Sequence, residues 1–179
     1  MVDDRWVVYW NEYTSKTYTY GSKIRFISRQ DVSYENPLMP PGTVINSWYS
    51  RTNFQGDKIE PSLPIIDGEG AYHISVDMDF EEGSEEDIML RIIFFDRYDE
   101  KAESVILRGR DNYFKPSIQT HSYRIELING GIHRFVFHSI ILKEVSQEEF
   151  DAEQERIEKL KRASKKGKTL RRKNKKSGR

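Results

Sequence analysis

The chain has 179 residues, of which 32% are charged, and its formal net charge is zero. This length suits one ordinary domain with an appendage and excludes two comfortable domains. The zero net charge hides three regions. Residues 1–145 hold 16 Lys or Arg against 23 Asp or Glu, residues 146–160 hold 2 against 6, and residues 161–179 hold 11 against none. We therefore expect an acidic body with a strongly basic tail.

No feature marks the chain for secretion or membrane insertion. It has no Cys, which fits a reducing compartment slightly better than an oxidising one. Its first residues are polar and acidic, and no apolar run typical of a signal peptide follows them. No segment approaches the roughly 20 apolar residues needed to span a bilayer. We expect a cytoplasmic protein.

Alternating apolar and polar residues predict a series of short β-strands. From Tyr72 to Phe80 every second residue is large and apolar, and the residues between them are polar. A period of two over this length is typical of a half-buried strand. In chain order, we expect strands at Trp6–Tyr9, Lys23–Ile27, Val44–Tyr49, Ala71–Phe80, Ile88–Phe95, Ser104–Arg108, Ser122–Leu127 and Arg134–Leu142.

Turn-forming residues separate these strands at short intervals. Examples are Tyr20-Gly21-Ser22, Pro40-Pro41-Gly42 and Asn129-Gly130-Gly131. Short strands at this spacing predict an all-β jelly roll or β-sandwich rather than alternating βαβ units, and the aromatic residues can fill its core. We place this domain at residues 1–145.

A helix is predicted directly after the sandwich. Ser146 and Glu149 have the spacing of a capping box, in which each side chain bonds the other residue's backbone N–H. Phe150, Ile157 and Leu160 then fall on one helical face. We expect an amphipathic helix over residues 146–163 that packs on the sheet or on a partner.

Residues 164–179 form a basic tail that contains almost nothing apolar. Such a segment cannot bury enough apolar area to offset the entropy of ordering, so we expect it to be disordered when free. Its charge can keep the chain soluble, contact an anionic membrane or an acidic protein, or bind nucleic acid. Nucleic acid is the least favoured partner, because the tail has no aromatic side chain to stack on bases. The candidate electrostatic residues are Lys165, Lys166, Lys168, Arg171, Arg172, Lys173, Lys175 and Lys176.

The sequence contains no recognisable catalytic, cofactor or metal motif. Acidic residues 81–87 lack the spacing of an EF-hand loop, so a solvated hairpin loop is favoured over a calcium site. Neither a nucleophile elbow nor a phosphate-binding loop is present. No Cys is available for zinc, and no metal-ligand pair is formed by His73, His121, His133 and His138. We predict a protein that is not an enzyme and uses no cofactor or metal.

Aromatic and amide residues concentrate in the first third of the chain. Trp10, Tyr13 and Trp48 lie there together with several Asn residues, including Asn36. Flat rings stack on sugars and amides bond hydroxyls, so this mixture suits a carbohydrate-binding surface, and it suits a protein interface equally well. A further interpretation, besides a carbohydrate-binding surface and a protein interface, is that most of these rings fill the core.

Three stretches carry a family resemblance. They are Tyr34 to Ile45 (Y-E-N-P-L-M-P-P-G-T-V-I), Phe94 to Tyr98 (F-F-D-R-Y) and Leu127 to Gly131 (L-I-N-G-G). In this order and spacing they resemble the third accessory secretory protein of the accessory Sec system of Gram-positive bacteria. The resemblance covers about residues 5–143, and N-P-L-M-P is its most specific motif.

The resemblance implies a non-enzymatic cytosolic subunit with a jelly roll similar to carbohydrate-binding modules. Members of the family assemble with two other accessory secretory proteins and cooperate with the accessory SecA motor. They support the export of glycosylated serine-rich-repeat adhesins, whose glycan is a candidate ligand. A basic tail that contacts anionic lipid would place the chain at the inner face of the membrane, beside the translocase. The alternative function is a stand-alone cytosolic carbohydrate-binding module.

The same motifs supply candidate contact residues. The prolines of the first motif fix the backbone and hold Leu38 and Met39 in an irregular crossing. In the second motif, Arg97 is available for a partner or for an ion pair with Asp96. The candidate partner or glycan contacts are Trp10, Tyr13, Asn36, Leu38, Met39, Trp48, Arg97 and Tyr98.

Overall fold

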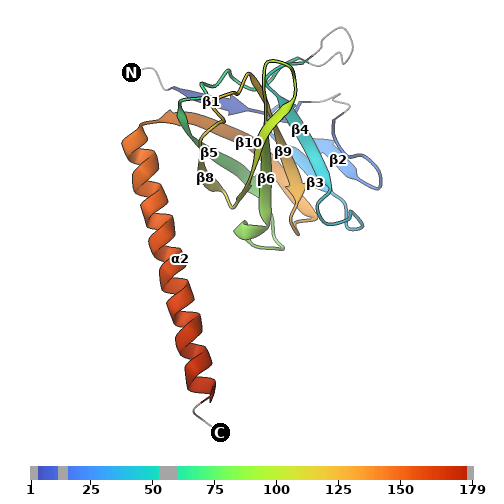
Figure 1. Cartoon of the computed structure of the whole chain (residues 1–179). Helices are drawn as coiled ribbons and strands as arrows, with labels where there is room; N and C mark the ends of the chain where they lie inside the picture. The colour runs from blue at the N-terminus through green and yellow to red at the C-terminus, as the bar shows by residue number, and fades with distance from the viewer. Residues whose placement is uncertain (1–3, 12–15, 53–59, 177–179) are drawn as a thin grey trace.

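The computed structural model describes residues 4–11, 16–52 and 60–176, with side chains described as far as residue 166. Two antiparallel sheets lie face to face, and a long helix leaves the end of the last strand (Figure 1). The helical elements are η1 (Glu85–Asp87) and α2 (Gln147–Lys176). The strands are β1 (Arg5–Val8), β2 (Lys23–Phe26), β3 (Val32–Glu35), β4 (Val44–Tyr49), β5 (Ala71–Asp79), β6 (Ile88–Phe95), β7 (Lys101–Arg108), β8 (Asp111–Phe114), β9 (Ser122–Asn129) and β10 (Arg134–Val145).

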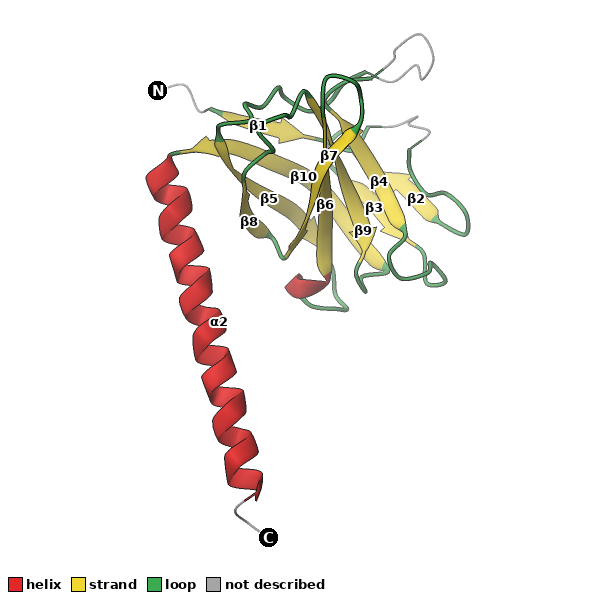
Figure 2. Cartoon of the chain, viewed as in Figure 1, coloured by secondary structure: helices red, strands yellow, loops and turns green. Residues whose placement is uncertain are grey.

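The order of the strands is that of a jelly roll. Sheet A has the order β2-β3-β10-β5-β8, with β1 also paired to β10, and sheet B has the order β4-β9-β6-β7 (Figure 2). From β3 to β10 the chain crosses between the sheets at every connection except β6–β7, which is a hairpin within sheet B. The eight strands from β3 to β10 thus form two four-stranded layers, β3-β10-β5-β8 over β4-β9-β6-β7, the arrangement that two Greek keys produce, and β1 and β2 extend sheet A. The predicted all-β jelly roll is confirmed.

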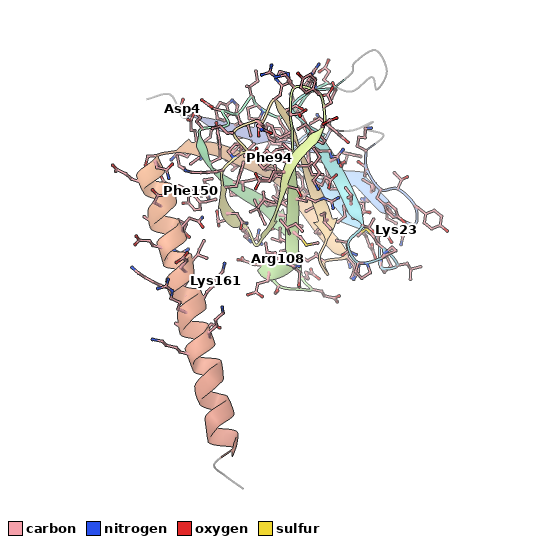
Figure 3. All side chains as sticks on the ribbon, in the orientation of Figure 1. Asp4, Lys23, Phe94, Arg108, Phe150 and Lys161 are labelled. Atoms are coloured by element: carbon pink, nitrogen blue, oxygen red, sulfur yellow. The ribbon has the colours of Figure 1, made fainter. Side chains whose placement is uncertain are left out.

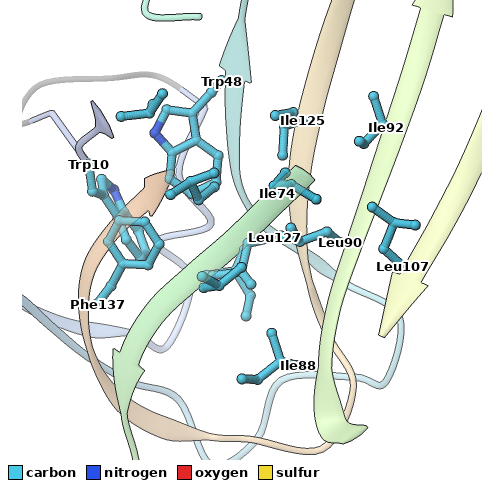
Figure 4. Close-up of a cluster of buried hydrophobic side chains, with 14 of the residues drawn as sticks. Trp10, Trp48, Ile74, Ile88, Leu90, Ile92, Leu107, Ile125, Leu127 and Phe137 are labelled. Atoms are coloured by element: carbon cyan, nitrogen blue, oxygen red, sulfur yellow. The ribbon is translucent and has the colours of Figure 1, made fainter. Parts of the chain in front are cut away.

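Alternate residues of both sheets fill the space between them. Ile74 and Ile92, on facing sheets, are fully buried, and the side chains drawn in Figure 4 converge on one continuous core. Trp10 and Trp48 lie at one side of this core, 2% and 3% exposed. The Trp10 ring centroid lies 6.1 Å from that of Trp48 and 5.6 Å from that of Phe137, both in edge-on geometry. Trp10 and Trp48 therefore fill the core.

Sheet A contains two short strands that the sequence pattern does not predict. Buried and less buried residues alternate along β3, with Val32 and Tyr34 buried. Four residues are too few to predict a strand, especially since Asn-Pro, a turn signal, follows directly. Residues of β8 begin with Asp111 and Asn112, two types that are rare in strands, and pairing with β5 overrides that preference.

The helix begins where the capping box predicts. The Ser146 hydroxyl accepts a hydrogen bond from the Glu149 backbone N–H at 3.1 Å. The first turns of α2 contact β5 and β8, where Lys115 bonds Gln147 and its Nζ lies 5.0 Å from the centre of the Phe150 ring. Figure 3 shows Phe150 at this junction and Lys161 farther along the helix.

The helix differs from the prediction in its length. The predicted helix ends near residue 163, but its backbone continues to Lys176. Lys and Arg are strong helix formers, and cations near a C-terminus interact favourably with the helix dipole. The low apolar content of residues 164–176 therefore predicts that this segment does not pack on the sandwich, but it does not predict whether the segment is helical. Of the helices in the described residues, none combines the length and the apolar character that crossing a bilayer requires.

Candidate binding surface

Two of the three motif stretches meet at one end of the sandwich. The Asn129 amide nitrogen donates hydrogen bonds to the carbonyl oxygens of Met39 and Pro40, both at 3.1 Å. Backbone bonds join the same segments, from Gly42 N–H to the Asn129 carbonyl at 2.9 Å and from Asn129 N–H to the Thr43 carbonyl at 2.8 Å. The N-G-G motif thus holds the N-P-L-M-P motif in place.

The glycines of N-G-G are required by close packing. A Cβ atom at Gly130 would lie 2.3 Å from the backbone carbonyl oxygen of Asp87. Because that atom belongs to the backbone, movement of a side chain could not relieve the clash. Gly131 has φ +133°, a conformation that L side chains rarely adopt. The Asn129 carboxamide oxygen accepts the Gly131 N–H at 3.1 Å and closes the turn. This motif is therefore explained by structure alone.

Asn36 anchors the other side of the N-P-L-M-P loop. It is 1% exposed, and its amide nitrogen donates to the Tyr20 carbonyl at 2.9 Å and to Ser22 Oγ at 3.0 Å. Its carboxamide oxygen accepts the Leu38 N–H at 3.3 Å. Met39 points inward and is 3% exposed. Between these two anchors, Leu38 projects into solvent.

Two apolar side chains stand out from these anchored loops. Leu38 is 89% exposed, and Tyr20, whose carbonyl oxygen bonds Asn36, is 84% exposed. We call the surface formed by Tyr20, Pro37 and Leu38 the motif surface. A large exposed apolar side chain on a backbone that is bonded on both sides loses little entropy when a partner covers it, so the motif surface is suited to protein binding.

An acidic groove adjoins the motif surface. It has a volume of about 480 Å³, and Pro37 of the motif surface is one of its lining residues. Phe80 and Phe135 contribute apolar lining, and Arg134 contributes a cation. Four carboxylates also line it, those of Glu35, Asp79, Glu81 and Glu82. The groove favours cationic or hydrogen-bond-donating groups of a partner over anionic ones.

A histidine clasp lies beside this groove. His138 Nδ1 is 2.6 Å from Asp31 Oδ1, and its Nε2 is 2.9 Å from Asp79 Oδ2. A register shift in β10 between Phe137 and Ser139 marks a bulge at His138, and bulges re-aim side chains in this way. The hydrogen bonds to Asp79 and then to Asp31 raise the pKa of His138 against the opposing effect of burial. The bond to His138 likewise lowers the pKa of Asp31.

The clasp makes stability depend on pH. A raised pKa of His138 stabilises the fold fully below its ordinary value of 6.5, and this contribution is lost as pH rises through the folded-state pKa. The lowered pKa of Asp31 stabilises the fold above 3.8, and its contribution is lost as pH falls. The clasp is therefore strongest between these two values. We expect His138→Gln to lower the denaturant midpoint more at pH 5.5 than at pH 8, and an equal loss at both would show that the imidazole acts only through packing.

The structure separates the predicted contact residues into three groups. Trp10, Asn36, Met39 and Trp48 are buried, so their assignment as contact residues is wrong: the rings and the thioether fill the core, and Asn36 bonds the backbone. Leu38 is exposed on the motif surface, while Arg97 and Tyr98 are exposed in the β6–β7 turn. Tyr13 lies outside the described residues.

The F-F-D-R-Y motif lies at the opposite end of the sandwich. Along the β6–β9 ladder, Ile88 pairs with Asn129 and Phe95 pairs with Ser122, so the two ends of β6 mark the two ends of the domain. The Asp96 carboxylate accepts the N–H groups of Tyr98 at 2.8 Å and Glu100 at 3.0 Å, which shapes the turn. Two of the three motifs therefore form one surface, and the third does not join it.

The predicted electrostatic residues lie on the second half of α2. Lys165 and Lys166 are exposed. The remaining six occupy positions whose side chains are not described: Lys168, Arg171, Arg172, Lys173, Lys175 and Lys176.

The sequence pattern placed Tyr20 in a turn and Glu81 and Glu82 in an acidic loop, but it did not identify Tyr20 as a contact residue, and it missed the groove and the clasp. Tyr20 precedes a Gly-Ser turn, and the carboxylates come from two distant segments, Glu35 and residues 79–82, so no local pattern links them. In residues 4–11, 16–52 and 60–176, no three His, Asp or Glu side chains are grouped so as to hold a metal ion.

Comparison with known proteins identifies a family. Residues 17–144 match the family model described as "Accessory Sec secretory system ASP3". The chain is 35% identical over 132 residues to the accessory Sec system protein Asp3 of Streptococcus gordonii, an alignment covering 74% of this chain and 82% of that protein. It is 28% identical over 141 residues to the Asp3 protein of Staphylococcus aureus, covering 79% of this chain and 43% of that protein.

Solved structures agree with the sequence matches. One chain in the crystal structure of accessory secretory proteins 1, 2 and 3 of Streptococcus pneumoniae is 27% identical, with a TM-score of 0.73, and the match covers 82% of this chain and 100% of that one. A chain in the Glycosylation Associate Protein (Gap123) complex of Streptococcus agalactiae is 30% identical, with a TM-score of 0.72, covering 79% of this chain and 45% of that one. The chain therefore belongs to the Asp3 family of the accessory Sec secretory system.

Proposed function

We propose that this chain is a non-enzymatic subunit of the accessory Sec protein-export machinery and assembles with the other two accessory secretory proteins. The observation that carries this proposal is the overlap with a whole chain in the Streptococcus pneumoniae structure of accessory secretory proteins 1, 2 and 3. The proposed task is structural: the subunit holds its partners together while a glycosylated serine-rich-repeat adhesin is exported. The accessory SecA motor is a further proposed partner.

The motif surface supplies a physical reason for binding rather than catalysis. The Leu38 N–H donates to the Asn36 side chain, and Asn129 donates to the carbonyl oxygen of Met39 in the same loop, yet the Leu38 side chain contributes nothing to the core. An exposed leucine on a rigid loop adds no stability to the isolated chain, whereas a partner that covers it removes apolar area from water. We assign Leu38 as a central contact in the assembly.

The second half of α2 is proposed to make a different kind of contact. Residues 161–179 carry 11 cations and no anion, so an anionic surface will attract them without specific geometry. We propose that they contact anionic lipid at the inner face of the membrane, close to the translocase. Nucleic acid is not favoured, because no aromatic residue occurs in this segment.

Leu38→Asp tests the assembly proposal directly. The change should weaken assembly with the two sister subunits at least about tenfold, because a carboxylate would be buried in an apolar contact. It should leave the melting temperature of the isolated chain nearly unchanged, because the side chain is 89% exposed. The measurement is co-purification of the three subunits, followed by titration of the purified proteins.

Ile65→Asp is the matched control. Ile65 is 90% exposed and lies in the loop between β4 and β5, near the end of the sandwich away from the motif surface. This variant should assemble like the unmodified chain. Failure of the unmodified chain to co-purify with its sister subunits under gentle conditions would refute the proposed function itself.

A stand-alone carbohydrate-binding module receives less support. Its motivation was the aromatic cluster, and both Trp10 and Trp48 are buried, with their indole N–H groups bonded to Thr17 Oγ1 at 3.1 Å and the Tyr9 carbonyl at 2.9 Å. Neither ring is available to stack on a sugar in this fold. Glycan binding in the assembled machinery would require other residues.

A further inference from the structure

The outer face of sheet B carries an ordered set of charged and aromatic side chains. Trp48, Leu90 and Ile125 point into the core. The residues that alternate with them therefore point outward, and cross-strand pairing places Tyr49 beside Arg124 and Glu126 beside Arg91. These four residues come from three adjacent strands, β4, β9 and β6.

Glu126 organises the two arginines. Its side chain is 5% exposed, and its Oε2 accepts from Arg91 Nε at 2.6 Å while Arg91 Nη2 lies 2.5 Å away. Its Oε1 lies 2.9 Å from Arg124 Nε, an ion pair whose geometry is not that of a hydrogen bond. Glu126 thus has cations on both of its carboxylate oxygens. The side chains of Arg91 and Arg124 remain 36% and 29% exposed, so both keep part of their surface in contact with solvent.

Arg124 is also held between two aromatic rings. Its guanidinium carbon lies 5.7 Å from the centre of the Tyr49 ring and 5.5 Å from the centre of the Phe95 ring. Lys16 Nζ lies 5.6 Å from the Tyr49 ring centre. An arginine fixed by both a carboxylate and two rings loses little rotamer entropy on binding, which is a property of interface hot spots.

The charge on this face opposes that of the body. A third cation on this face is exposed Arg108, labelled in Figure 3. It pairs with Met89, which lies two residues from Arg91 along β6. Glu126 is the only anion that alternation places outward among the described residues of β4, β6, β7 and β9, and it is already paired. The body as a whole, residues 1–145, has 23 acidic against 16 basic residues. A basic face on an acidic domain needs a specific explanation.

Helix α2 does not cover this face. It is the only α-helix of the described residues, and its contacts are with β5 and β8 of sheet A. Next to the arginines, Ile106 is 57% exposed at the position paired with Arg91. The face thus combines an exposed apolar residue with pre-oriented donors, as protein interfaces do.

We propose that the outer face of sheet B, through Arg91, Arg108 and Arg124, binds an acidic segment of a protein partner. Guanidinium groups match carboxylates through paired N–H donors, and the two beside Glu126 are partly exposed. A single-stranded nucleic acid fits less well, because cations already lie against both aromatic rings that a base would need to stack on. This inference extends the proposed function, since the sister subunits of the complex are the expected source of the acidic segment.

The first test maps binding on the full chain by NMR. The probe is a synthetic decapeptide of alternating Glu and Ser, titrated at pH 6.5 while the side-chain Nε–Hε signals of arginine are recorded, with a dT10 oligonucleotide in a parallel experiment. We expect saturable shifts of the Arg91, Arg108 and Arg124 signals with the peptide. Shifts confined to the arginines of α2 would overturn the proposal, and so would tighter binding of the oligonucleotide than of the peptide at this face.

The second test compares two charge reversals in the assembled complex. Arg108→Glu leaves the Glu126 array intact, and we expect it to weaken assembly about tenfold, with a loss that shrinks at high salt. Arg25→Glu makes the same charge change on exposed β2 of sheet A and should have no more than a twofold effect. Equal effects would overturn the proposal while leaving the proposed function in place. If the acidic peptide shifts the arginine signals of sheet B but the chain assembles with neither sister subunit, the proposed binding face would be supported and the proposed function refuted.

Discussion

Trp10→Ala should lower the free energy of unfolding by about 3–5 kcal/mol, the range for truncating a large buried aromatic side chain. Trp10 is 2% exposed, and its ring lies within 6.3 Å, centre to centre, of four others, those of Tyr34, Trp48, Phe135 and Phe137. Domains are stable by only about 5–15 kcal/mol, so this variant should be partly unfolded near 37 °C. Urea denaturation followed by circular dichroism measures the change.

Two variants separate packing from other effects. Trp6→Ala on β1 removes a ring that is 39% exposed and should cost much less than Trp10→Ala. Trp10→Phe keeps most of the ring but loses the N–H bond to Thr17, and it should fall between these two. A Trp10→Ala variant as stable as Trp6→Ala would mean that the ring does not occupy the core and would restore Trp10 as a candidate contact residue.

Asn129→Ala should have the second largest effect, with two consequences. The Asn129 amide nitrogen donates to the carbonyl oxygens of Met39 and Pro40, which would both lose this donor. The Gly131 N–H would lose its acceptor, the Asn129 side-chain oxygen. The expected loss is about 2–4 kcal/mol, because unsatisfied buried polar groups cost about 1–3 kcal/mol each and water can reach some of them. Freed from Asn129, the loop would also hold Leu38 less firmly, so assembly should weaken even at temperatures where the variant is folded.

Asn112→Ala provides the comparison for this variant. Asn112 also donates a side-chain hydrogen bond to a backbone carbonyl, that of Gly109 at 3.2 Å, but it is only half-buried and lies away from the motif loops. It should cost less than Asn129→Ala and leave assembly unchanged. Thermal unfolding and subunit titration of both variants give the two readouts. An Asn129→Ala chain that is destabilised but assembles normally would show that loop rigidity is not needed for binding.

The sequence predicts the sandwich well because the alternation of apolar and polar residues within each strand shows which of its side chains are buried. A strand such as β5 alternates for nine residues, and burial follows the alternation from Tyr72 to Met78. Local patterns narrow the possible strand orders without selecting one, because pairing of β3 with β10 joins residues about a hundred positions apart. Such long-range pairing leaves no trace in a window of ten residues.

The binding surface was only partly predictable for a similar reason. Proline spacing correctly indicated an irregular loop around Leu38, and an exposed leucine there is consistent with that pattern. Which aromatic rings face solvent depends on the pairing of distant strands, so Trp10 and Trp48 could not be assigned from composition. The arginine array of sheet B depends likewise on register, since Arg91 and Glu126 become neighbours only when β6 and β9 pair.

The junction between β10 and α2 has a mechanical consequence. One residue, Ser146, separates the end of the strand from the start of the helix, and Lys115 and Tyr113 hold the first turns against the sheet. The helix has 30 residues and is therefore roughly 45 Å long at 1.5 Å per residue. The cations of its second half are consequently carried on a stiff arm of set direction rather than spread through a sphere. A surface that the helix contacts would therefore lie at a distance from the sandwich that the length of α2 sets, and the proposed contacts at the motif surface and along α2 would lie on separate parts of the molecule.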